Sequence, residues 1–155
     1  VSIELNVDGK QLKTSVEPRV TLLDALRDYL DVTACKRVCD RGTCGTCTVM
    51  LDGKTIYACS VLAVEAVGSK ITTATGLMEG DSLNRVQQAF WEKDASQCGF
   101  CTPGFVVACS AVLEKNHKAS VEELKHGLGG NICRCGTYEQ MDQALGELAG
   151  GNGNG

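Results

Sequence analysis

Ten cysteines in a chain of 155 residues are the feature with the clearest chemistry. They stand at Cys35, Cys39, Cys44, Cys47, Cys59, Cys98, Cys101, Cys109, Cys133 and Cys135. Most neighbours within a clump are separated by only one to four residues. Such thiols converge on a point and suit a metal site better than disulfides between distant strands. Residues 1–7 alternate polar and apolar types instead of resembling a signal peptide, so we expect metal thiolates in a reducing cytoplasm.

The first clump has the spacing Cys39-x4-Cys44-x2-Cys47, followed by Cys59. This is the spacing of plant-type ferredoxins, which hold a [2Fe–2S] cluster. Two ferric ions bridged by two sulfides need two thiolates each, and a short loop can supply three of the four. Glycines in the loop let the backbone pass close to the cluster, where its N–H groups can bond the sulfurs. We therefore predict a [2Fe–2S] cluster on these four cysteines.

Zinc is the alternative occupant of this first site. A structural zinc ion usually takes its four ligands from two Cys-x2–4-Cys knuckles, which a three-cysteine loop with one distant ligand does not match. A Rieske centre needs two histidines, but His117 and His126 both lie away from the cysteine clumps and are expected to be solvated. The spacing therefore favours the iron–sulfur cluster.

The remaining clumps are two close pairs, Cys98-x2-Cys101 and Cys133-x-Cys135. Each pair precedes a predicted helix, and helix N-termini offer free N–H groups and positive partial charge to thiolates. The Gly-Gly-Asn loop at residues 129–131 permits close backbone approach. On spacing alone, two such pairs suit either a second cluster or a zinc ion, and both interpretations stay open at this point.

The elements that must position the first clump are predominantly strands. Period-two alternation predicts two hairpins, each turning at an Asp-Gly pair. The predicted strands are residues 2–7, 12–16, 48–51 and 54–58. Between the hairpins, Thr21 is a predicted helix N-cap. The apolar stripe of that helix is Leu22, Leu26, Tyr29 and Leu30. Together these elements predict an α+β domain.

Helical periodicity replaces alternation after a linker predicted at residues 76–81. Four amphipathic helices follow, with stripes that begin at Leu83, Phe105, Val121 and Tyr138. Pro103 suits the first turn of the second helix, and Ser120-x-x-Glu123 is a capping box for the third. Four helices predict a bundle. The predicted organisation is a domain at residues 1–75, a helical domain at 76–149 and a flexible tail at 150–155.

Charge and hydropathy exclude two classes of partner. The net charge is -4, and the chain has neither a basic face for nucleic acid nor a polybasic membrane segment. No apolar run approaches the length of a membrane-spanning helix. We therefore expect no nucleic-acid binding and no direct membrane insertion.

Three segments resemble signatures of the xanthine dehydrogenase (molybdenum hydroxylase) family. They are Gln-Cys-Gly-Phe-Cys-Thr-Pro-Gly at 97–104, Gly-Asn-Ile-Cys-Arg-Cys at 130–135, and Cys-x4-Cys-Gly-x-Cys-Thr-Val at 39–49. The resemblance covers nearly the whole chain. It implies an N-terminal β-grasp plant-type ferredoxin domain followed by a C-terminal four-helix-bundle [2Fe–2S] domain. It also implies a second cluster, rather than zinc, on Cys98, Cys101, Cys133 and Cys135.

The same resemblance implies that this chain is the small iron–sulfur subunit of a molybdenum hydroxylase. A molybdenum–pterin cofactor in a large partner subunit would oxidise the substrate. Electrons would then pass through the helical-domain cluster and the ferredoxin-type cluster to FAD in another subunit or to a cytochrome. Gln97 matches the residue whose amide contacts the pterin, and Cys135 matches the cluster ligand that also touches it. This chain would have no substrate-converting site of its own.

The chain departs from the family pattern at several positions. Val38 and Asp40 stand where glycine is common, and Cys35 stands where a small residue or threonine is usual. Cys35 and Cys109 are expected to be spare, with Cys109 on the core face of its helix. The order Gly-Thr-Tyr at 136–138 replaces the commoner Thr-Gly-Tyr and resembles isoquinoline oxidoreductases, some of which use a cytochrome.

Two other functions are alternatives to the role of a molybdenum hydroxylase subunit. A free-standing two-cluster ferredoxin would diffuse between partners and need no pterin contact, so Gln97 and the tip at 133–135 disfavour it. A zinc-stabilised adaptor would be colourless, and its absorption spectrum would distinguish it at once.

Overall fold

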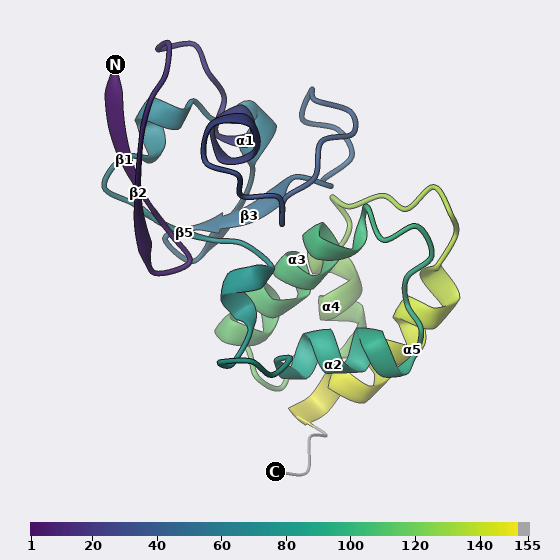
Figure 1. The fold of residues 1–155 in the computed structure, drawn as a ribbon. Coiled ribbons are helices and arrows are strands. Elements are labelled where there is room, and N and C mark those ends of the chain that lie inside the picture. Colours follow the sequence, from purple (N-terminus) through teal and green to yellow (C-terminus); the bar gives the residue numbers. More distant parts are fainter. Residues whose placement is uncertain (152–155) are drawn as a thin grey trace.

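The computed structural model describes residues 1–151, so most of the tail predicted at 150–155 lies outside the described residues. The first part of the chain forms a β-sheet with a short helix, and the second forms a group of helices packed against it (Figure 1). Within residues 1–151, all five strands precede α2, α3, α4 and α5. This order confirms the α+β fold class and the predicted group of four helices.

Both predicted hairpins are present. β1 (Ser2–Val7) pairs antiparallel with β2 (Lys10–Ser15), and β3 (Thr48–Leu51) pairs antiparallel with β4 (Lys54–Tyr57). Both residues of each Asp-Gly turn have positive φ, the conformation that tight two-residue hairpins require. The predicted strands therefore differ from the observed ones only by one or two residues at their ends.

The central strand is one that the sequence patterns did not predict. β5 (Lys70–Thr72) runs parallel to β1 and antiparallel to β3, which gives the sheet order β2-β1-β5-β3-β4. Ile71 in its middle is fully buried. Three residues are too few to show alternation, so only tertiary pairing identifies this strand.

The predicted helix after Thr21 begins as expected and then changes type. The backbone N–H of Asp24 donates to the Thr21 side chain over 3.1 Å, which caps α1 (Leu22–Asp24). A π-helix follows at Ala25–Tyr29. Because the wider turn shifts the buried face, Tyr29 is 48% exposed, and its place in the predicted stripe was wrong.

The helices of the second part are α2 (Arg85–Glu92), α3 (Thr102–Lys115), α4 (Val121–Gly127) and α5 (Tyr138–Leu148). The Ser120–Glu123 capping box of α4 is formed, and Pro103 lies in the first turn of α3 as predicted. Leu83 does not join the core stripe of α2, because Asn84 caps that helix and Leu83 precedes it. Short 3-10 turns occupy Ala58–Ser60, Ala63–Ala66, Thr75–Leu77 and Ala149–Gly151.

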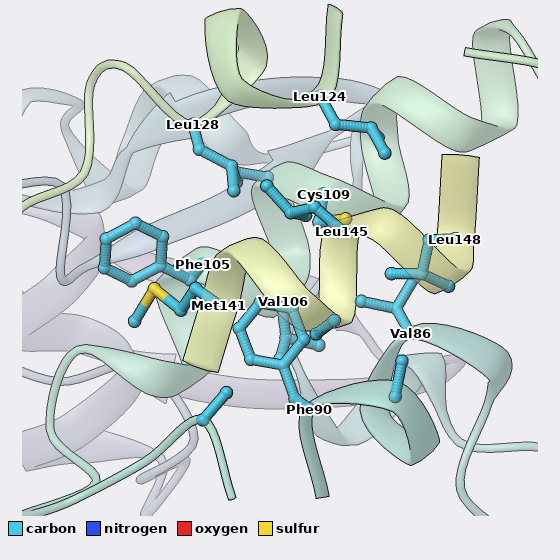
Figure 2. Close-up of a cluster of buried hydrophobic side chains, with 14 of the residues drawn as sticks. Val86, Phe90, Phe105, Val106, Cys109, Leu124, Leu128, Met141, Leu145 and Leu148 are labelled. Carbon is cyan, nitrogen blue, oxygen red and sulfur yellow. The ribbon is translucent and has the colours of Figure 1, made fainter. Parts of the chain in front are cut away.

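Each part of the chain has its own hydrophobic core. The helical core is shown in Figure 2 and contains Val86, Phe90, Phe105, Val106, Cys109, Leu124, Leu128, Met141, Leu145 and Leu148. A smaller buried cluster joins the two parts, with Met50 from β3 against Val107 and Ala111 from α3. This contact sets α3, and the cysteines before it, against the sheet. Among residues 1–151, no helix has the length and apolar character to cross a bilayer.

Candidate iron–sulfur sites

The loop that carries the first cysteine clump is anchored at its entry by two arginines. Arg37 forms ion pairs with Asp24 and Asp28, at 2.6 and 2.7 Å. Arg27 donates to the carbonyl oxygen of Cys35 over 2.7 Å. These contacts tie the loop to the short helix that precedes it, so the loop starts from a defined place beside the sheet.

Backbone N–H groups inside this loop point at cysteine sulfurs. The amides of Thr43 and Cys44 donate to Sγ of Cys39, over 3.4 and 3.3 Å. The amide of Gly42 donates to Sγ of Cys59 over 3.2 Å. Hydrogen bonds from Arg41, Cys44 and Thr43 lower the pKa of the Cys39 thiol to about 6. The loop thus stabilises thiolates, as a metal site requires.

Cys47 lies directly before β3, and Cys59 lies in the turn after β4. Burial raises the pKa of the Cys47 thiol to about 12, and this thiol interacts with that of Cys59. The thiols of Cys39 and Cys44 also interact. Each of the four thiols therefore interacts with at least one other, and two irons with two thiolates each would use such a set of four ligands.

Residues with positive φ shape this loop at positions 40, 42 and 45. Gly45 has φ of +73°, and a side chain there would collide with the backbone of Gly130 and Asn131. Asp40 has φ of 55°, in the left-handed region that favours glycine. Asp tolerates this region better than most residues, which explains how it replaces the more frequent glycine here. Val38, by contrast, is 58% exposed.

The second site lies between the starts of α3 and α5. Cys101 is the N-cap residue of α3. Cys133 lies five residues before the first residue of α5, with its Sγ 3.2 Å from the Thr137 hydroxyl. Thiol interactions pair Cys98 with Cys135 and Cys101 with Cys133. Burial raises the pKa of Cys101 to about 12. For Cys133, burial opposes ionisation, but the hydrogen bonds from Thr137 outweigh it and lower the pKa to about 7.

The donor sets of both sites fit a [2Fe–2S] cluster. Each site offers four thiols, with backbone or hydroxyl donors directed at sulfur. In the described part of the chain, no three Cys, His, Asp or Glu side chains close around a point suited to a single metal ion. A two-iron cluster spreads its four ligands over two centres.

Of the other residues predicted to matter from the sequence, some are exposed and some are buried. Gln97 and Cys135 are exposed beside the second site. Cys35 and Cys109 are buried in the cores of the two parts, and the core position predicted for Cys109 is confirmed. His117 and His126 are exposed, as predicted.

The two sites are joined by direct contacts between their loops. The amide of Ile132 donates to the Cys44 carbonyl oxygen over 2.9 Å. The side-chain amide of Asn131, which is buried, donates to the Gly45 carbonyl oxygen over 2.9 Å. Sequence patterns indicated that the loop at 129–131 allows close approach, but not that its neighbour would be the first cysteine loop.

Tyr57, which no sequence motif indicated, also connects the two loops. The phenol of Tyr57, at the end of β4, donates to the Gly130 carbonyl oxygen over 2.7 Å. Its position two residues before Cys59 was the only signal available in the sequence. Contacts between residues 73 positions apart have no local signature.

Comparison with known families matches both parts of the chain. Residues 5–72 match the 2Fe-2S iron-sulfur cluster binding domain family, and residues 73–146 match the [2Fe-2S] binding domain family. The aldehyde oxidoreductase iron-sulfur-binding subunit of Escherichia coli O157:H7 is 39% identical over 163 residues, covering 96% of this chain and 71% of that protein. The nicotine 6-hydroxylase small subunit of Paenarthrobacter nicotinovorans is 38% identical over 154 residues, covering 99% and 93%.

Two solved structures have the same fold over nearly the whole of this chain. A chain of quinoline 2-oxidoreductase from Pseudomonas putida 86 superposes with a TM-score of 0.90 at 39% identity, covering 95% of this chain and 91% of that one. The aldehyde oxidoreductase from Desulfovibrio desulfuricans superposes with a TM-score of 0.88 at 37% identity, over 95% of this chain but only 17% of that much longer one. The same two-part fold thus occurs both as a separate chain and within a larger one.

Proposed function

The chain belongs to the small [2Fe–2S] iron–sulfur subunits of the molybdenum hydroxylase family, and on that premise we propose how it conducts electrons. Electrons would arrive from a molybdenum–pterin site in a larger partner subunit and leave through the sheet part of this chain. The observation that carries this proposal is the pair of four-thiol sites joined by the Ile132–Cys44 hydrogen bond.

The proposed ligands of the first cluster are Cys39, Cys44, Cys47 and Cys59, and those of the second are Cys98, Cys101, Cys133 and Cys135. A [2Fe–2S] cluster, when bound, accepts one electron and releases it again. The chain's own residues hold the thiolates and supply the N–H groups that tune the potential. This division leaves substrate conversion to the partner.

The entry point for electrons is proposed at the exposed tip around Gln97 and Cys135. Both residues are accessible, so a cofactor lodged in another subunit can reach them. The amide of Gln97 would hydrogen-bond the pterin, and Cys135 would link it to the second cluster. An interface that keeps two redox groups in place is expected to be permanent, with a buried area on the order of 2,000 Å² or more.

The exit is proposed at the first cysteine loop, where Val38, Asp40, Arg41 and Thr43 are exposed. We propose FAD in another subunit as the acceptor. A cytochrome is the second candidate, favoured by the Gly136-Thr137 order. Thiolate clusters persist best where disulfides do not form, which supports a cytoplasmic complex.

The test is purification of the native complex through a tag on this chain, followed by metal analysis and electron paramagnetic resonance. We expect a larger molybdenum subunit to co-purify, with about four irons per small chain and two distinct reduced-cluster signals. A monomer with two clusters and no molybdenum partner would instead identify a free-standing ferredoxin. A colourless protein containing zinc would contradict both.

A further inference from the structure

We propose that Tyr57 is a positioning residue for electron transfer between the two sites. Its phenol holds the loop at residues 129–132 against the first cysteine loop, so that Cys133 stays connected to Cys44. This inference rests on the proposed function, because it takes both sites to hold clusters. It adds a role for a residue that is not a ligand and lies outside the three cysteine segments.

The first step is the fit between Tyr57 and Gly130. The phenolic O–H donates to the Gly130 carbonyl oxygen over 2.7 Å, from the end of β4. Position 130 has no side chain, and a Cβ built there would run into the phenolic oxygen. The hydroxyl and the loop therefore fit together only because residue 130 is glycine.

The second step is what this contact holds in place. Two residues further on, the Ile132 amide donates to the Cys44 carbonyl oxygen over 2.9 Å. Ile132 is bonded directly to Cys133, so covalent bonds and a single hydrogen bond connect a ligand of one site to a ligand of the other. Electron tunnelling is faster along such a bonded path than through an open gap. Keeping this hydrogen bond closed therefore keeps the two sites coupled.

The third step concerns which residues hold the loop at 129–132 against the first site. Asn131 fastens the middle of the loop through the Gly45 carbonyl oxygen. Tyr57, two residues before Cys59 in the chain, fastens the preceding residue, Gly130. Without the phenol, the start of the loop is held to the first site only through Asn131 and through the Ile132–Cys44 hydrogen bond itself. In the transfer itself one electron is lost at the donor site and gained at the acceptor, and no bond or proton changes place.

The experiment compares Tyr57→Phe with Tyr29→Phe in the purified native complex. Tyr29 is a half-exposed tyrosine on the π-helix and serves as the matched control. Loss of one hydrogen bond of this kind should open the loop more often by about two- to tenfold. Amide hydrogen exchange in a peptide covering residues 129–134 should accelerate by that factor in Tyr57→Phe. The spin–spin splitting between the two reduced clusters should also change, with iron content unaltered.

A second variant tests the fit itself. Gly130→Ala should disturb exchange and splitting because its methyl group meets the phenol, and adding Tyr57→Phe should partly restore both. Wild-type exchange and splitting in Tyr57→Phe would overturn the inference. So would equal damage from Gly130→Ala with and without the phenol. Failure of the proposed function is distinct, because it appears in the unmodified protein as a missing cluster or a missing molybdenum partner.

Discussion

The backbone N–H of Cys133 donates a 2.8 Å hydrogen bond to the phenolic oxygen of Tyr138, five residues further along. The ring of Tyr138 packs edge-on against Phe105, with ring centroids 6.3 Å apart. The N-terminus of α5 thus fixes the backbone of a proposed cluster ligand through one hydroxyl group. Changes to that hydroxyl should act on the second site and leave the first unaffected.

Tyr138→Phe keeps the ring and removes only the acceptor. We expect a loss of about 1 kcal/mol in the free energy of unfolding, because the Cys133 amide loses its partner. The resonance signal of the second cluster should shift, while that of the first stays at its wild-type position. Thermal unfolding and electron paramagnetic resonance of the reduced protein measure the two effects. A shift in the first signal would show that Tyr138 does not act locally.

The close approach of the two parts predicts opposite effects for two helical glycines. A Cβ at Gly104 would stand 2.6 Å from the Gly45 carbonyl oxygen, whereas a Cβ at Gly146 would meet nothing within 4 Å. Gly104→Ala should therefore destabilise the protein by about 1–3 kcal/mol and loosen the contact between the parts. Gly146→Ala, on the exposed face of α5, should stabilise it by up to about 1 kcal/mol. Chemical denaturation measures the free energy of unfolding of both variants. Destabilisation of equal size in both would contradict the steric explanation.

The two spare thiols should be unreactive in the folded protein. Burial raises the pKa of Cys35 to about 11 and that of Cys109 to about 12, from an ordinary value near 9. Each folded-state pKa lies above its unfolded value, so the stability involved is fully present below about pH 9 and is lost as the pH rises toward 11–12. We expect iodoacetamide at pH 8 to label neither thiol until the protein is denatured. Mass spectrometry locates the label, and rapid labelling of folded Cys109 would refute its burial.

Substitution of the same two thiols separates packing from ligation. Cys109→Ala should cost about 1 kcal/mol of unfolding free energy through lost apolar contact, and Cys35→Ser should also leave the iron content unchanged. Cys59→Ser is the control, since it should remove the first cluster. If Cys35→Ser lost iron as Cys59→Ser does, the ligand set of the first site would need to be reassigned.

Gln97→Ala tests the proposed entry point for electrons. The side chain is exposed, so its loss should leave both clusters and the stability of the chain intact. Electron flow from reduced molybdenum to the clusters should fall by about tenfold, the value of one lost hydrogen bond of about 1.4 kcal/mol. Rapid-mixing kinetics on the intact complex measure this rate. Gln143→Ala, an exposed glutamine on α5, is the control and should have wild-type kinetics.

Local sequence determined most of the elements and the composition of both proposed sites. Hairpins at Asp-Gly turns, the capping box at Ser120 and helical stripes such as that of Met141 depend on neighbours within a few residues, so their patterns are visible in the chain. Cysteine spacing is equally local, because ligands that must meet at one cluster recur at short, fixed intervals.

Tertiary structure alone decided three further features. β5 is a strand because β1 and β3 flank it, since its three residues carry too little periodicity to predict it. The turn of Ala25–Tyr29 is π-helical and moves Tyr29 to the surface, although helix propensity would continue the α-helix. The link between the sites depends on the contacts of Gly130 with Tyr57 and of Ile132 with Cys44, which join residues far apart in the chain. The spacing of cysteines along the chain indicates which residues one loop brings together. Contact between two loops depends instead on how the sheet and the helices pack.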